Sequence, residues 1–475
     1  MSTKPPASYT SVATTTSLNN AATSTNGDYK ALVCIFMPGA MDSHNFIVPT
    51  GINSQRGIYE SARPVTTPNP DIDEMVGIAL TEILPLTGIG SWGLHPSLVG
   101  IQSMFNDGDM AIIRDVGVLN KPTTKTQFLN DLSFRPDQLF SHNTQQDIWQ
   151  AAVPPKQPRD TGWFGRTANL IDDIFNPDQV VESGSTGISK GFRQSVSYYP
   201  KNSNVFPAVN LGVGLTFSGV VGFNTNKVKM YHGESNSSPF SIPTSPNNLM
   251  HNAFRDIFIS DINSQATVSF ATSALPSSIA GIFTAALTSV TSQSLPQSGF
   301  ITQVMNVAAV INSRGSGKFN QRRQMIICSI GGWDNHNSLR EYEDPQLRTL
   351  DIAIKALVDA LKQMGVYDNV VIFNESEFSR TLKSNGTYGT DHAWSGHSFV
   401  IGGPVKGGLY GPEPDYTLGG PRDAEFEGRF IPNYSIEQYY GTLLEWFDIP
   451  HDLVPLVLPN IVVFDRNPIG FLTTV

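Results

Sequence analysis

The sequence predicts an α/β fold built on a mostly parallel β-sheet. Four short apolar runs have the length and composition of buried strands, at residues 31–37, 109–116, 324–330 and 369–373. Helical patterns lie between successive runs, and a strand–helix–strand order favours parallel pairing with right-handed crossovers. Three of the four runs end in loops that carry Asp and His, and such loops meet at one edge of an open α/β sheet.

Amphipathic helices are expected around these strands. Leu98, Ile101, Met104 and Phe105 recur at helical spacing behind Pro96, a residue suited to a first helical turn. Further helices are predicted at residues 249–259, 301–312, 350–364 and 434–447. The helix at 350–364 connects the third and fourth strands, as a crossover between parallel strands requires.

The chain divides by composition into an arm and one large domain. Residues 1–28 are rich in Ser, Thr and Asn and poor in large apolar groups, which predicts a flexible arm. Residues 29–475 are then expected to form one domain, a length that also suffices for two. A Ser/Thr/Asn-rich stretch at about 183–297 is interpreted as an inserted cap over the carboxyl edge of the sheet.

Charge and hydropathy exclude several classes of protein. The net charge is −10, only 15% of residues are charged, and no Lys/Arg-rich run suggests a nucleic-acid surface. The sequence has no run of 18 or more apolar residues, so a membrane span is not predicted. The first residues contain neither an apolar signal core nor a twin-arginine pair. Cys34 and Cys328 lie in predicted strands, so buried free thiols are favoured over a disulfide.

The loop at residues 390–397 offers Asp391, His392 and His397. Carboxylate oxygen and neutral imidazole suit zinc, manganese or similar divalent ions. Taken alone, the loop is explained equally well by one functional histidine and two hydrogen-bonded loop residues.

Two more loops of the same construction favour the metal. Asp334 and His336 follow the strand at 324–330, while Asp42 and His44, with Asn45 beside them, follow the strand at 31–37. Four of the nine histidines of the chain fall in these three loops. The sequence therefore predicts a binuclear metal site.

Ser141 and His142 stand side by side before a helical pattern. In the local sequence, capping of that helix by Asn143 or Thr144 is the favoured interpretation. The alternative makes Ser141 a nucleophile activated by a metal ion and His142 a neighbouring ligand or substrate contact.

Glu377 and Arg380 follow the strand at 369–373. They could form a local surface ion pair. Near a binuclear metal they would instead orient ligands or bind an anionic substrate.

Motifs in a fixed order give the chain a family resemblance. They lie at residues 39–45, 94–96, 141–142, 146–149, 162–166, 331–336, 377–381, 390–392, 397 and 402–403. Over roughly residues 30–470 the sequence resembles the bacterial family called domain of unknown function 1501, within the alkaline phosphatase/sulfatase superfamily. In the first motif, which usually reads Gly-Gly-Asn-Asp-Gly, this chain has Ala40, Met41 and Ser43 but keeps Asp42.

The resemblance implies an alkaline-phosphatase-like, three-layer α/β/α domain with two divalent metal ions, zinc foremost and manganese, calcium or iron as alternatives. One ion would be held by Asp42, Asp391 and His392. The other would be held by Asp334, His336 and His397. Ser141 is the best match to the superfamily nucleophile.

The function implied is metal-dependent hydrolysis of a small anionic ester, foremost a phosphate ester. A sulfatase is a weaker alternative, since neither cysteine lies in a Cys/Ser-x-Pro-x-Arg motif. The third alternative is a non-catalytic surface or assembly protein that retains the fold, with a homo-oligomer left open. Family and composition favour an extracellular or periplasmic location.

Overall fold

The computed structural model describes residues 29–51, 54–66, 75–157, 162–164, 166–167, 170, 217–224, 227–233, 275–312, 314 and 323–473. The predicted arm at 1–28, the predicted helix at 249–259 and most of the predicted cap at 183–297 lie outside these residues.

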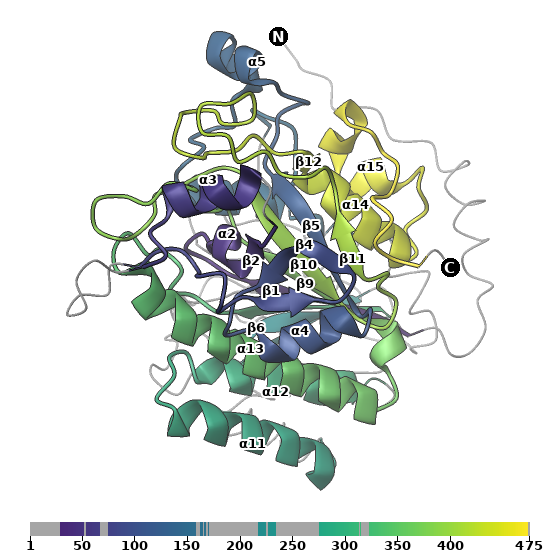
Figure 1. Cartoon of the computed structure of the whole chain (residues 1–475). Coiled ribbons are helices and arrows are strands. Elements are labelled where there is room, and N and C mark those ends of the chain that lie inside the picture. Colours follow the sequence, from purple (N-terminus) through teal and green to yellow (C-terminus); the bar gives the residue numbers. More distant parts are fainter. Residues whose placement is uncertain are drawn as a thin grey trace, which may run out of the picture.

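A nine-stranded sheet forms the centre of the described structure (Figure 1). Its strand order is β11-β5-β10-β9-β1-β8-β6-β7, and β12 pairs with β5. The strands are β1 (Lys30–Phe36), β5 (Met110–Gly117), β6 (Phe217–Asn224), β7 (Lys227–Gly233), β8 (Arg323–Ser329), β9 (Val370–Glu375), β10 (Gly396–Ile401), β11 (Gly408–Tyr410) and β12 (Tyr434–Ser435). All four predicted strands are present.

The sheet is mostly parallel, as predicted. The central strand β1 pairs in parallel with both β8 and β9. Strand β10 runs antiparallel to β9 and to β5, so β5 has the direction of β1 although two strands separate them. The carboxyl ends of β1, β8, β9 and β5 therefore lie at one edge, together with the segment that enters β10.

Side chains alternate between the two faces of β1 and fill two hydrophobic clusters. Ala31, Val33 and Ile35 belong to one cluster, while Leu32 and Cys34 belong to the other. Helices α4 (Val99–Asn106), α12 (Gly299–Asn312) and α13 (Leu339–Gln363) cover the first face, and α11 (Ser277–Ser292) packs outside α12 and α13. The opposite face carries α6 (His142–Ala151), α14 (Ile436–Trp446) and α15 (Val454–Val457).

A second, three-stranded sheet has the order β2-β4-β3. The remaining elements are α2 (Ser43–Phe46), β2 (Ile47–Pro49), α3 (Ser54–Ala62), β3 (Leu84–Leu86), β4 (Ile89–Leu94), α5 (Lys125–Asn130) and the 3₁₀ turns η1 (Leu132–Phe134), η3 (Tyr367–Asn369) and η4 (Pro459–Val463).

Helix α13 begins well before the predicted start at residue 350. It includes Pro345, which interrupts a sequence pattern because proline cannot donate an intrahelical hydrogen bond. Helix α14 agrees closely with its predicted range, and Ser435 and Gln438 form a capping box at its start.

Three described elements of the predicted insertion, β6, β7 and α11, join the core. Strand β6 pairs antiparallel with β8 and so extends the sheet at that edge. Helix α11 packs on α12 and α13 in the helical layer.

The two cysteines are free and buried. They lie on neighbouring strands, but Cys34 faces the α14 side and Cys328 the α13 side. The prediction of buried free thiols is confirmed.

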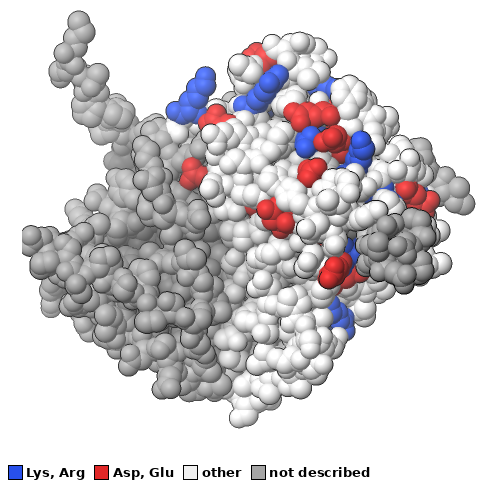
Figure 2. All heavy atoms as spheres, turned by 90° about the vertical axis from the view of Figure 1, so that its left-hand side faces the viewer, with Lys and Arg blue, Asp and Glu red and all other residues white. Residues whose placement is uncertain are grey.

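Surface charge and helix hydropathy agree with the composition. On the described part of the face in Figure 2, basic and acidic side chains are intermixed rather than gathered by sign. No helix among the described residues combines the length and apolar character needed to cross a bilayer.

Candidate metal centre

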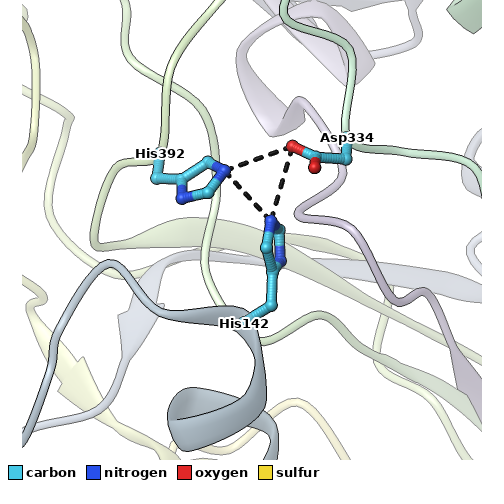
Figure 3. A group of neighbouring side chains, drawn as sticks. All are labelled: His142, Asp334 and His392. Carbon is cyan, nitrogen blue, oxygen red and sulfur yellow. Dashed lines mark hydrogen bonds and ion pairs between the residues drawn. The ribbon is translucent and has the colours of Figure 1, made fainter.

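Two loop segments and one helix end bring ionisable side chains together at the carboxyl edge of the sheet. The loop after β8 supplies Asp334 and His336, and the segment before β10 supplies Asp391 and His392. His142, the first residue of α6, approaches from the other side (Figure 3).

The central group is His142, Asp334 and His392. The Nε2 atoms of the two histidines lie 3.0 Å apart, and Oδ1 of Asp334 lies 3.2 Å from His392 Nε2 and 3.4 Å from His142 Nε2. These separations suit donors that share one cation at about 2.0–2.2 Å.

His336 adds a fourth donor atom at the edge of this group. Its Nε2 lies 2.9 Å from Oδ1 of Asp334 and 3.0 Å from Nε2 of His392. The side chains of His336 and Asp334 are 45% and 49% exposed, so a ligand in the group is accessible to solvent.

Each imidazole is oriented through its other ring nitrogen. Nδ1 of His392 lies 2.8 Å from the carbonyl oxygen of Phe140, which can only accept, so His392 carries its proton on Nδ1. Nδ1 of His142 lies 2.6 Å from Glu377 Oε1, and Nδ1 of His336 lies 2.9 Å from Asp391 Oδ1. The neutral tautomers thus direct Nε2 lone pairs at a common position, as histidine ligands of metals do.

The pKa shifts of Asp334 and His392 favour the forms that bind a cation, whereas the shift of His142 favours its protonated form. Burial raises the pKa of Asp334, but hydrogen bonding and charge from Arg380 outweigh burial and hold that pKa at about 2. The pKa of His392 is lowered by burial and by nearby cationic groups, which favours the neutral imidazole. For His142, burial lowers the pKa, yet the contact with Glu377 leaves a net upward shift.

Arg380 ties the loops together. Its fully buried guanidinium donates to the carbonyl oxygens of Gly39 (3.0 Å), Ala40 (3.0 Å), Trp333 (3.1 Å) and Thr390 (3.1 Å), and it contacts the carboxylate of Asp334. Arg380 therefore positions Asp334 from inside the protein.

Glu377 is buried behind His142. Its Oε1 accepts from His142 Nδ1, from the backbone N–H of Gly39 (2.9 Å) and from Gln146 Nε2 (2.9 Å). Instead of the expected local ion pair with each other, Glu377 contacts His142 and Arg380 contacts Asp334. Both side chains therefore orient residues of the candidate centre.

Asp42 lies in a separate buried network. Nη2 of Arg63 donates to Oδ2 at 2.7 Å and to Oδ1 at 3.0 Å, and the side chains of both residues are almost fully buried. Asn45 belongs to the same network, because its Oδ1 accepts from Arg63 Nη1 at 2.6 Å and from Tyr59 Oη at 2.7 Å. Arg63 lies in none of the motifs found in the sequence.

His397 and His44 share a second buried network. The Oη of Tyr416 lies 3.3 Å from His397 Nε2 and 3.1 Å from His44 Nδ1. Nδ1 of His397 accepts from the backbone N–H of Asp115 at 3.2 Å. Both ring nitrogens of His397 are thus engaged, and its hydrogen-bond partners lie outside the group at Asp334.

The expected capping of α6 by Asn143 or Thr144 is wrong, because both residues lie inside the helix; Ser141 occupies the N-cap position, without a side-chain cap hydrogen bond. Its role as nucleophile stays a prediction that rests on the family resemblance.

Comparison with known proteins gives a partial family match. A family model described as Protein of unknown function (DUF1501) matches residues 318–420, a stretch that holds every predicted metal ligand except Asp42. No curated protein matches.

One similar solved structure is a sulfatase-related protein of Bacteroides thetaiotaomicron, from work on the metabolism of multiple glycosaminoglycans by a versatile core genetic locus. It is 11% identical, and the alignment covers 89% of this chain and 73% of the other with a TM-score of 0.30. Similarity at that level supports neither a shared fold nor a shared activity, so the alkaline-phosphatase-like arrangement remains a prediction.

Proposed function

We propose that this protein is a divalent-metal-dependent hydrolase whose metal ion is held by His142, Asp334 and His392, with His336 beside them. The observation that carries the proposal is the convergence of three Nε2 atoms and one carboxylate oxygen, each imidazole being anchored through Nδ1. Two lone pairs 3.0 Å apart repel one another unless a proton or a cation lies between them.

The donor set narrows the choice of metal. Imidazole nitrogens with one carboxylate suit zinc, and also manganese or iron. Calcium is less suited, because it prefers six to eight oxygen ligands. When bound, such an ion polarises an ester oxygen and acidifies bound water.

The chain itself orients the donors and leaves them accessible. Glu377 and Asp391 hold the rings of His142 and His336, and Arg380 holds Asp334. The guanidinium of Arg380 contacts backbone carbonyls and Asp334, and its Nη1 lies 3.4 Å from His336 Nε2. Its role in the proposal is therefore positioning of the donors rather than substrate contact.

The proposed substrate is a small anionic ester, foremost a phosphate ester, and Ser141 is the proposed nucleophile. Both follow from the family resemblance together with the position of Ser141 beside His142. Hydrolysis requires water at the centre, and the exposure of Asp334 and His336 supports such access.

The test is metal content and hydrolysis by the full chain and by His392→Ala. We expect bound zinc, manganese or iron by elemental mass spectrometry, and hydrolysis of aryl phosphate mono- or diesters, with both lost in the variant. The control is His451→Ala, which removes a half-exposed histidine that pairs with Glu445 outside the centre.

An unchanged metal content in His392→Ala would contradict the proposed metal site. Metal without hydrolysis of phosphate or sulfate esters would favour the non-catalytic alternative. Hydrolysis of sulfate esters alone would favour the sulfatase alternative.

A further inference from the structure

We infer that the centre takes one divalent ion rather than two, because the guanidinium of Arg63 supplies at Asp42 the positive charge that the resemblance assigns to a second metal ion. This inference rests on the proposed function, since it concerns the metal content of that same centre. It departs from the binuclear prediction in three of the six predicted ligands, because Asp42 and His397 lie in other networks and Asp391 orients His336.

The carboxylate of Asp42 is already fully used. Besides the two hydrogen bonds from Arg63, its Oδ1 accepts from the backbone N–H groups of His44 (3.0 Å) and Asn45 (3.3 Å), at the start of α2. The hydroxyl of Thr390 donates to Oδ2 at 3.4 Å. A carboxylate offers about four lone-pair positions, so a metal ion at Asp42 would have to displace a present donor.

Arg63 is fixed as firmly as the carboxylate that it binds. Its Nε donates to the carbonyl oxygen of Leu382 at 2.8 Å, and Nη2 donates to that of Thr381 at 2.8 Å. Nη1 donates to Asn45 at 2.6 Å, and the side chain is fully buried. Removing Asp42 from this arrangement would leave a buried, unpaired guanidinium, a costly state.

His397 is likewise committed to other partners. Its ring is fully buried, with Tyr416 at one nitrogen and the backbone of Asp115 at the other. The rings of His44 and Trp92 pack edge-on against it, at centroid distances of 5.6 and 6.5 Å. To coordinate a metal beside Asp334, His397 would have to leave this aromatic environment.

The other four predicted ligands form one group instead of two. His392, Asp334 and His336 meet at the centre, and Asp391 holds His336 from behind. His142 completes the group from α6. These donors form one cation site. Asp42 is instead neutralised by the guanidinium of Arg63.

The test counts metal ions in the full-length protein. The protein is stripped with a chelator, titrated with Zn²⁺, passed through a desalting column and analysed by elemental mass spectrometry against protein concentration. The same titration is made with His392→Ala, His397→Gln and Asp42→Asn. Circular dichroism and thermal unfolding establish whether each variant is folded.

We expect about one tightly bound equivalent in the wild type and in His397→Gln, and its loss in His392→Ala. Asp42→Asn removes the counter-ion of Arg63 and can unfold the protein. If this variant is folded, we expect it to bind one equivalent of Zn²⁺ as well. Two equivalents in the wild type, with one lost in His397→Gln, would overturn the inference while leaving the proposed function intact. No tight equivalent in the wild type would overturn the proposed function itself.

Discussion

Nδ1 of His142 lies 2.6 Å from Oε1 of Glu377, and the glutamate side chain is fully buried. A buried carboxylate behind a metal-ligating imidazole fixes its tautomer and raises its basicity. The contact links the start of α6 to the loop after β9, so the sheet orients His142, the proposed metal ligand on the helix.

We therefore expect Glu377→Gln to weaken Zn²⁺ binding by about 10–100-fold. Competition with a chelating dye measures the change. Glu445→Gln is the matched control, because Glu445 pairs at 2.7 Å with His451, which is half exposed. Equal affinity in Glu377→Gln and the wild type would show that His142 does not depend on this carboxylate.

Arg380→Met is expected to destabilise the fold by about 3 kcal/mol or more, since it leaves several buried carbonyl oxygens without donors. Chemical denaturation measures the free energy of unfolding. Lys355→Met is the control, because it breaks an exposed ion pair with Asp359 and should cost less than about 1 kcal/mol. Similar losses in both variants would contradict a central role for Arg380.

Glu375 gives a dependence of stability on pH. Burial raises its pKa to about 8, although Tyr440 donates to it at 2.6 Å. The pKa of Glu375 is therefore higher in the folded chain than in the unfolded chain. Its contribution to the free energy of unfolding is fully present below about pH 4.5 and is lost as the pH rises through about 8.

The stability of the wild type relative to Glu375→Gln should fall by up to about 1.4 kcal/mol per pH unit within that window. Denaturation of both proteins at pH 5, 6, 7 and 8 measures this difference. A difference that does not change with pH would show that Glu375 titrates alike in the folded and unfolded chains.

The two cysteines are expected to resist modification in the folded protein. Burial is the main cause that raises the pKa of both thiols, and the reactive thiolate is therefore scarce. A thiol reagent such as dithionitrobenzoate should react with neither in native buffer and with both in denaturant. Rapid native reaction of either thiol would contradict its buried position.

The sequence predicts strands β1, β5, β8 and β9 because they are apolar runs buried on both faces, but it does not predict the other five strands of the sheet. It also predicts that Asp334, His336, Asp391 and His392 follow strand ends at one edge, which the parallel pairing brings together. How those residues divide into sites is a different matter, since a strand end fixes position only to within a loop.

The partners of Asp42 and His397 are not predicted from the sequence. Arg63 lies in no motif, and Tyr416 lies in a long segment without regular structure. Both contacts depend on side chains that meet only in the folded chain. The position of His142 is easier to predict, because it is the first residue of a helix and the helix fixes where its side chain begins.

Two glycines hold the loops in direct backbone contact. A Cβ atom at Gly39, where φ is +113°, would lie 2.8 Å from the backbone nitrogen of Asp334, and one at Gly389 would lie 2.1 Å from the carbonyl carbon of His336. The distance between these loops is therefore limited by direct contact between their backbones, and side chains such as Glu377 and Arg380 then orient the donors. Directed evolution toward new substrates is therefore expected to tolerate few substitutions at these two glycines. More substitutions are expected to be tolerated in the segments that contact His392 from outside these loops, near Phe140 and Arg429.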